Sequence, residues 1–146
     1  LLLIDMGASQ DGYASDMTRV SHFGRPKQRI REMYRAVLEA QLAAIDRVRA
    51  GRPASDVDSA ARKVLKSHQL DREFIHSTGH GLGLEIHEPP RLGKKETTRL
   101  EAGMVITIEP GVYVEGRGGI RIEDTVLVTE SGCEILTPTP KELVSL

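Results

Sequence analysis

The character of the sequence changes at Phe74, and this change constrains the fold more than any other feature. Before it, apolar residues recur at helical spacing in two stretches, residues 26–50 and residues 55–68. After it, the chain is rich in glycine and in strand-forming residues, with segments such as MVITIEPGVYV and IRIEDTVLV separated by the turn signal GRGG. Two helices followed by several strands predict an α+β fold.

The ends of these elements carry their own signals. Pro26 stands near the start of the first helix, and Gly51 is typical of the residue just past its end. Ser55 and Asp58 predict a capping box at the start of the second helix, with Asp in place of the usual Glu. A further short helix is predicted over residues 140–146.

Composition narrows the kind of partner. The 146 residues include 20 Lys and Arg against 21 Asp and Glu, for a net charge of −1, and these charges are spread along the chain. This balance argues against a nucleic-acid surface, and no apolar run or polybasic patch indicates a membrane. We therefore expect a small molecule or a peptide as the partner. The single cysteine, Cys133, excludes an internal disulfide and favours a reducing cytoplasm.

The first four residues, Leu1 to Ile4, are all apolar and are not preceded by a methionine. Such a run is typical of the middle of a buried strand. We therefore expect the chain to be a piece of a longer protein.

Asp5 and Asp16 lie in a predicted hairpin over residues 1–21, and the hairpin brings them close. If the turn is centred on Gln10-Asp11, the two carboxylates face each other with Cβ atoms roughly 5 Å apart. If Asp11-Gly12 is the turn pair, Asp5 opposes Thr18 and Asp16 is a diagonal neighbour at roughly 7 Å. Like charges this close destabilise a fold unless a cation or a proton lies between them, although either Asp could also belong simply to the turn.

The segment HSTGHGLGLEIHE places His76, His80 and His87 within twelve residues, among three glycines. It lacks the spacing of a dinucleotide fingerprint, and the prolines after Glu88 exclude a helical zinc-protease motif. Glycines that alternate in a strand mark a close backbone approach, which we interpret as room for a ligand beside the imidazoles.

Glu109 and Glu123 are embedded in strongly apolar strand-like sequence, where a carboxylate needs a positive partner. Arg121 lies two residues before Glu123 and predicts an ion pair with it. That one Arg cannot neutralise four acids. Two Asp, two Glu and one or more His, without Cys, favour hard or borderline divalent ions, and four carboxylates balance two such ions. The inventory therefore predicts a two-metal hydrolase.

Four motifs, in order, resemble one known family: DMGASQDGYASDMTR, TGHGLGLEIHEPP, TIEPG and GIRIEDTVLVT. They are similar to the metallopeptidases with the pita-bread fold, namely Xaa-Pro dipeptidases, aminopeptidase P and methionine aminopeptidases. The resemblance covers essentially the whole chain. It implies an α+β pita-bread catalytic domain, of which residues 1–146 would be the C-terminal portion, without its upstream part and without a separate N-terminal domain.

The resemblance also implies a role for each matched residue. The ligands of a dinuclear centre would be Asp5, Asp16, His80, Glu109 and Glu123, with Asp16 and Glu123 bridging two divalent ions. We expect Mn²⁺, with Co²⁺ or Zn²⁺ as alternatives. Glu109 would also accept and relay the proton of the attacking water.

Three further residues would act around this centre. His87 would stabilise the developing oxyanion, His76 would be a substrate-side partner, and Arg121 would orient Glu123.

Within the family, GYASDMTR and GIRIEDT look like the proline-specific branch, because methionine aminopeptidases have a His where this chain has Asp124. This implies removal of the N-terminal residue from peptides with proline second, by a protein that is a homodimer at full length. The alternatives are a methionine aminopeptidase, a non-catalytic pita-bread binding module, and creatinase-like chemistry without metal. Retention of all five ligands disfavours the last two.

Overall fold

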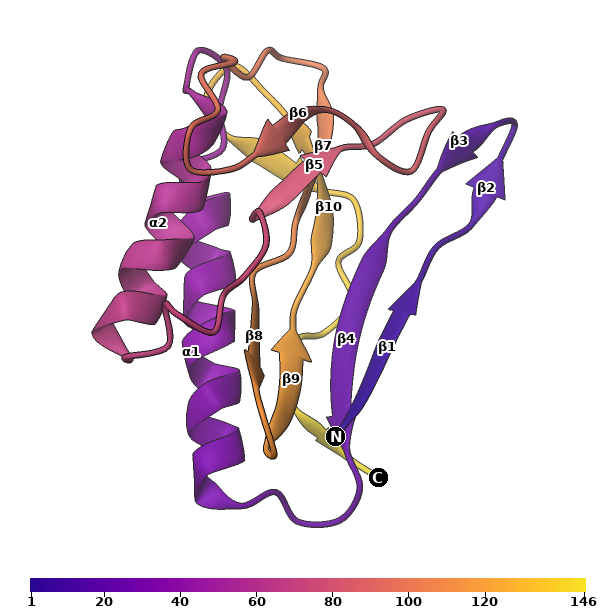
Figure 1. Cartoon of the computed structure of the whole chain (residues 1–146). Coiled ribbons are helices and arrows are strands. Elements are labelled where there is room, and N and C mark those ends of the chain that lie inside the picture. The colour runs from indigo at the N-terminus through magenta and orange to yellow at the C-terminus, as the bar shows by residue number, and fades with distance from the viewer.

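The computed structural model describes residues 1–146, and it places two helices on one side of a set of short strands (Figure 1). The predicted α+β class is confirmed. The helices are α1 (Gln28–Ile45) and α2 (Ala54–Ser67). The strands are β1 (Leu2–Met6), β2 (Ser9–Gln10), β3 (Tyr13–Ala14), β4 (Met17–His22), β5 (Gly79–Gly81), β6 (Glu88–Leu92), β7 (Val105–Ile108), β8 (Gly111–Val114), β9 (Gly118–Arg121), β10 (Asp124–Val128), β11 (Cys133–Ile135) and β12 (Val144–Ser145).

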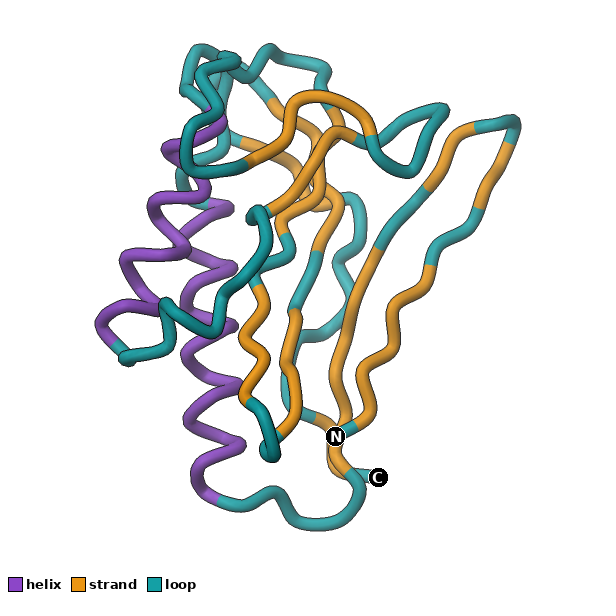
Figure 2. The backbone as a smooth tube through the Cα atoms, viewed as in Figure 1, coloured by secondary structure: helices purple, strands orange, loops and turns teal.

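The first part of the chain forms one long antiparallel hairpin that projects from the rest of the molecule (Figure 2). Asp11 and Gly12 form its turn, with φ values of 52° and 88°, a conformation that the Asp-Gly pair accommodates well. Asp5 therefore opposes Thr18, which is the second of the two predicted registers. The burial predicted for Leu1 to Ile4 is wrong in part, because β1 is an edge strand and Leu1 and Leu2 are exposed.

The two helices pack against each other and cover one face of the strands (Figure 1). The apolar faces of both helices and of β7 and β10 form one core, in which Val37, Leu65 and Ile106 are fully buried. The first helix ends at Ile45, earlier than predicted. The backbone N–H groups of Ala50 and Gly51 instead donate to carbonyls of distant loops, which ends the helical pattern.

The predicted capping box at the start of the second helix is wrong. Pro53 is the N-cap residue, and Ser55 lies inside α2. The Asp58 side chain is fully buried, because it pairs with Arg62 one turn later and with Thr78. The end of this helix agrees with the prediction, with His68 at the C-cap.

A five-stranded sheet in the order β11-β10-β7-β5-β6 forms the central layer. Two of the glycines of the His-rich segment lie in β5, and the close backbone approach predicted for them is confirmed. A Cβ atom on Gly79 would lie 1.9 Å from the Thr107 carbonyl oxygen, and one on Gly81 would lie 2.2 Å from that of Pro89. These glycines therefore permit close packing of backbone on backbone.

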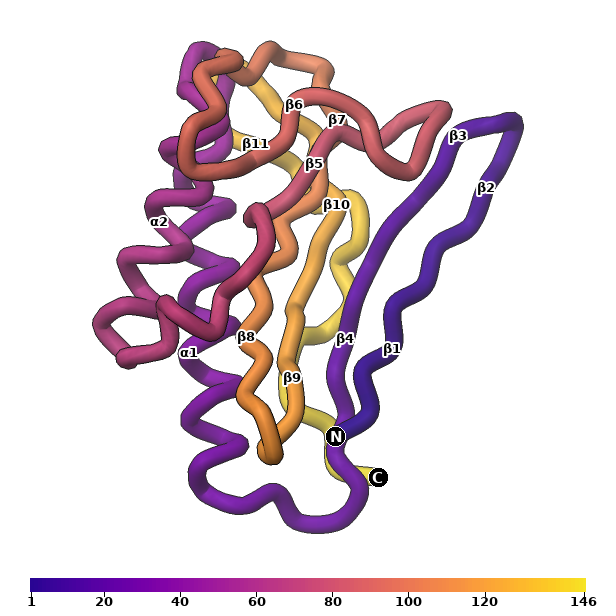
Figure 3. Tube along the Cα trace, in the orientation of Figure 1, coloured from indigo at the N-terminus to yellow at the C-terminus, as the bar shows by residue number.

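The last residues do not form the predicted short helix. Val144 and Ser145 form β12, which pairs in parallel with β4, so both ends of the chain flank the same strand (Figure 3). Neither helix is long and apolar enough to cross a membrane.

Candidate metal centre

Loops and strand ends around β5 bring the predicted ligands toward one another. His80 lies on β5, Glu109 directly follows β7, and Glu123 lies between β9 and β10. Asp16 precedes β4, and Asp5 is on β1. A cavity of about 620 Å³ opens over this region and has no hydrophobic residue in its lining. Its lining includes His76, His80, His87, Glu109 and Arg121.

Three of the residues form a tight cluster. Asp16, His80 and Glu123 each present a donor atom, and these atoms lie within 4.8 Å of one another. Glu109 joins the cluster through His80, since Glu109 Oε1 and His80 Nε2 are 3.2 Å apart. Asp5 lies at the margin, where its carboxylate accepts a hydrogen bond from Arg121 Nη2 at 2.5 Å.

The electrostatics of the cluster fit a cation. Glu123 is only 2% exposed, and its side chain has one hydrogen-bond donor, the Thr18 hydroxyl at 2.6 Å. Burial, reinforced by Glu109, raises the pKa of Glu123 to about 8. Burial and the neighbouring Asp5 also raise the pKa of Asp16. Carboxylates so close and so little paired are the arrangement that divalent ions stabilise.

His80 is held in the orientation that a metal ligand needs. Its Nδ1 lies 2.9 Å from the Gly81 carbonyl oxygen, which can only accept, so Nδ1 carries a proton and Nε2 faces the carboxylates. Burial lowers the pKa of His80, but its hydrogen bonds with Glu109 and the Gly81 carbonyl, together with the negative charges of Glu109 and Glu123, outweigh this effect, so the pKa is raised overall. A cation would compete with that proton for Nε2.

The predicted ion pair between Arg121 and Glu123 does not form. Arg121 instead donates to Asp5, to the Tyr113 hydroxyl and to the Thr18 hydroxyl. Because Thr18 in turn donates to Glu123, Arg121 is connected to that glutamate through one intervening hydroxyl. The sequence patterns do not indicate Thr18 or Tyr113 as part of this site. The hairpin register, which sets Thr18 opposite Asp5, was the signal that could have found Thr18.

The two remaining histidines, His76 and His87, also line the cavity. The rings of His87 and His80 are 4.4 Å apart between centroids, and His87 is exposed. His76 is half-buried, with Nδ1 2.8 Å from the Ser77 carbonyl oxygen and Nε2 3.2 Å from the Tyr113 hydroxyl. Burial lowers the pKa of His76, which favours a neutral ring that donates from Nδ1 and accepts at Nε2.

Residues 1–130 match metallopeptidase family M24. The chain belongs to this family. It is 50% identical over 144 residues to the Xaa-Pro dipeptidase of Pyrococcus furiosus, an alignment that covers 99% of this chain and 41% of that protein.

Solved structures of M24 relatives have the same fold. The Xaa-Pro dipeptidase from Bacillus anthracis superposes with a TM-score of 0.97 at 45% identity, over 99% of this chain and 41% of that one. The X-Pro aminopeptidase from Thermotoga maritima gives a TM-score of 0.95 at 41% identity, with the same shares. The predicted pita-bread fold is thus confirmed. The chain spans about 41% of the length of these relatives.

Proposed function

We propose that the protein containing this chain is a dinuclear metallo-exopeptidase that removes the N-terminal residue from Xaa-Pro dipeptides or longer Xaa-Pro peptides. The observation that carries the proposal is the cluster of Asp16, His80 and Glu123, of which His80 lines a polar cavity. The relatives at 41–50% identity named as Xaa-Pro dipeptidase and X-Pro aminopeptidase support the substrate class.

The metal ligands in this proposal are Asp5, Asp16, His80, Glu109 and Glu123. By the family resemblance, Asp16 and Glu123 would hold both ions; both belong to the tight cluster, and burial among other acids raises the pKa of each. The oxygen-rich donor set favours Mn²⁺, with Co²⁺ or Zn²⁺ as the ions that the same donors would also accept. When bound, the two ions supply Lewis-acid activation of water and of the scissile carbonyl.

The side chains around the cluster divide the remaining tasks. Glu109, next to His80 and at the cavity wall, accepts the proton of the attacking water and passes it to the leaving nitrogen. His87, exposed to the cavity, donates to the developing oxyanion, and His76, which also lines the cavity, contacts the substrate. Arg121 orients Glu123 through Thr18 and also holds Asp5.

A peptide panel tests this function on the protein as its gene encodes it, including any residues beyond this chain. Metal-loaded protein is given Xaa-Pro dipeptides, Xaa-Pro tripeptides and Met-Ala peptides, with Asp16→Ala as the inactive control. Hydrolysis of Xaa-Pro peptides alone supports the proposal. Preference for Met-Ala would indicate a methionine aminopeptidase, and no hydrolysis with two ions bound would indicate a binding module.

Two further properties complete the proposal. We infer a cytoplasmic location, supported by the single free thiol of Cys133, and a homodimer, supported by the family resemblance alone. Fractionation of the source cells and sedimentation of the full-length protein test these two statements.

A further inference from the structure

The Asp58–Arg62 pair on α2 is a buried charged group to which the proposed mechanism gives no task. Asp58 has no exposed side-chain surface, and its Oδ2 accepts a hydrogen bond from Arg62 Nε at 2.7 Å. The Arg62 side chain is 16% exposed. Burial of an ion pair does not by itself show that the pair stabilises the fold. The other hydrogen bonds of the two side chains therefore indicate what the pair does.

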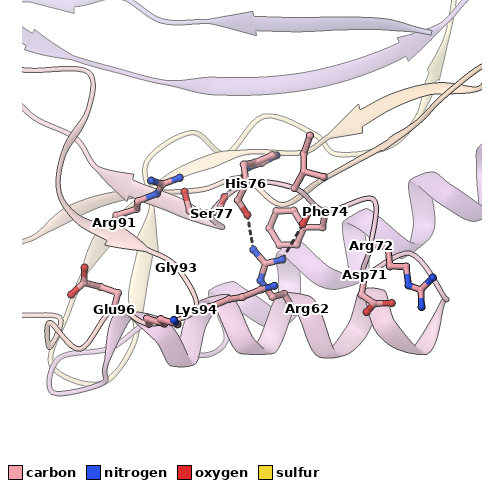
Figure 4. A pocket seen from close by; sticks show the side chains of 12 residues that line it. Arg62, Asp71, Arg72, Phe74, His76, Ser77, Arg91, Gly93, Lys94 and Glu96 are labelled. Atoms are coloured by element: carbon pink, nitrogen blue, oxygen red, sulfur yellow. Dashed lines mark hydrogen bonds between the residues drawn. The ribbon is translucent and has the colours of Figure 1, made fainter.

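Those bonds all lead to the segment between α2 and β5 that carries His76. Arg62 Nη2 donates to the His76 carbonyl at 2.6 Å, and Nη1 donates to the Phe74 carbonyl at 3.0 Å. The guanidinium also lies 4.1 Å from the centre of the Phe74 ring. Figure 4 shows Arg62 reaching from the helix to both carbonyls at the edge of a cavity of about 870 Å³.

The other carboxylate oxygen of Asp58 is connected to Glu109 through Thr78. Asp58 Oδ1 accepts from the Thr78 hydroxyl at 2.9 Å, and the Thr78 carbonyl accepts from the Glu109 backbone N–H at 2.7 Å. Thr78 is fully buried. Two residues with proposed roles in catalysis, His76 and Glu109, are therefore each connected to the pair through very few hydrogen bonds.

Residues 69–78 contain no helix or strand, so no ladder of backbone hydrogen bonds fixes their path. Arg62 supplies three donors in a planar fork, which a single lysine ammonium cannot reproduce. From this geometry we propose that Asp58 and Arg62 are positioning residues, which fix the backbone of His76 and Glu109 relative to the metal cluster. This inference rests on the proposed peptidase function.

The test compares two Arg62 variants with a control at a residue just before the same helix, in the full-length protein. Arg62→Met keeps much of the apolar stem and removes every donor, and Arg62→Lys keeps the charge beside Asp58 but loses the fork. Arg52→Met is the control, because Arg52 pairs with Asp56 at 3.4 Å near the start of α2 and makes no bond to residues 74–78.

We expect Arg62→Met to lower kcat for an Xaa-Pro dipeptide by about 10- to 100-fold, since small misplacements of catalytic groups cost this much. We expect a smaller loss for Arg62→Lys. Both variants should keep the metal content of the wild type, and Arg52→Met should keep its kcat as well. A readout independent of activity is the NMR signal of the His76 imidazole, which should move in the Arg62 variants and stay in place in Arg52→Met.

Each outcome decides the role of the pair. Unchanged kcat per metal-loaded molecule, together with an unmoved His76 signal, would show that Arg62 only stabilises the fold. If Arg62→Met does not fold, Arg62→Lys decides by the same two measurements. If the wild type hydrolyses no Xaa-Pro peptide, the proposed function fails, and the His76 signal still tests the positioning role.

Discussion

Glu123 and Asp124 are consecutive buried carboxylates with opposite surroundings. Asp124 is fully buried and accepts hydrogen bonds from Arg19, Gln41 and Thr137, and its other cationic partner is Lys141. Glu123 is almost as buried, yet its side chain has only the Thr18 hydroxyl as a donor. The protein thus compensates the charge of Asp124 with its own cationic side chains and gives Glu123 no cationic partner.

The same contrast separates the rest of the molecule into two kinds of acidic group. Asp58 and Asp124 are buried, and each pairs with an arginine. Asp16 and Glu123 lie close together without such a partner, beside His80, which lines the polar cavity. Partnering, rather than burial, distinguishes the carboxylates of the scaffold from those of the candidate metal centre.

The largest effect should follow from removal of a carboxylate in the uncompensated set. Asp16→Ala should abolish peptidase activity and reduce bound metal from two equivalents toward one or none, because a bridging ligand holds both ions. Elemental analysis and peptide hydrolysis on the same sample measure this. The fold should survive, because the contact of Asp16 with Thr125 is made by its backbone carbonyl. Two tightly bound ions in the variant would remove Asp16 from the bridging role.

When metal is chelated, removing the charge of Asp124 and removing the charge of Glu123 should change the free energy of unfolding in opposite directions. Asp124→Asn should cost about 3–5 kcal/mol, because Arg19 and Lys141 lose their buried counter-charge. Glu123→Gln should instead stabilise the metal-free protein at neutral pH, because it removes an uncompensated buried carboxyl group. Urea unfolding in the presence of a chelator measures both. A loss of stability of similar size in both variants would contradict the distinction between the partnered Asp124 and the unpartnered Glu123.

The pH dependence of the free energy of unfolding, measured on the metal-free protein, also tests the contrast between Glu123 and Asp124. The folded pKa of Glu123, about 8, lies above the ordinary value of 4.5, so the folded state holds this proton more tightly than the unfolded state does. The free energy of unfolding should therefore fall as the pH rises from about 4.5 to about 8. This slope should become shallower in Glu123→Gln and should persist in Asp124→Asn.

A smaller and more selective effect is expected at the histidines. His87→Ala should keep its metal and lose on the order of 10²-fold in kcat, the usual cost of one oxyanion donor or acid–base group. His80→Ala should lose metal, because His80 belongs to the tight cluster. Kinetics and metal analysis of the two variants separate these roles, and equal metal loss in both would mean that one assignment is wrong.

Local patterns in the sequence predicted the elements of the fold better than they predicted contacts. Helical spacing predicted both helices, because an amphipathic stripe depends only on neighbours along the chain. The capping box failed for the opposite reason, since the acceptor atoms of Asp58 are taken by Arg62 and by Thr78, which is twenty residues away. Likewise, nothing local indicated that residues 144–145 would pair with β4.

The sequence predicted which types of residue form the candidate site better than it predicted which of them contact each other. Acids in apolar sequence and three clustered histidines indicated a polar centre, and the structure brings Asp16, His80 and Glu123 together. The Arg121–Glu123 pair was predicted from the two-residue period of a continuous strand. In the structure β9 ends at Arg121 and β10 begins at Asp124, so that period does not apply to Glu123.

The smallest effect is expected for a charge pair that is exposed to solvent. Arg35 and Glu39 lie one turn apart on α1 with 3.8 Å between charged atoms, and their side chains are 67% and 47% exposed. Water already solvates both charges, so Arg35→Ala should change the free energy of unfolding by no more than about 0.5 kcal/mol. Urea unfolding beside Asp124→Asn gives the direct comparison. If Arg35→Ala were as costly as Asp124→Asn, the number of partners would not explain why Asp124 matters, and the distinction between compensated and uncompensated carboxylates would need another physical basis.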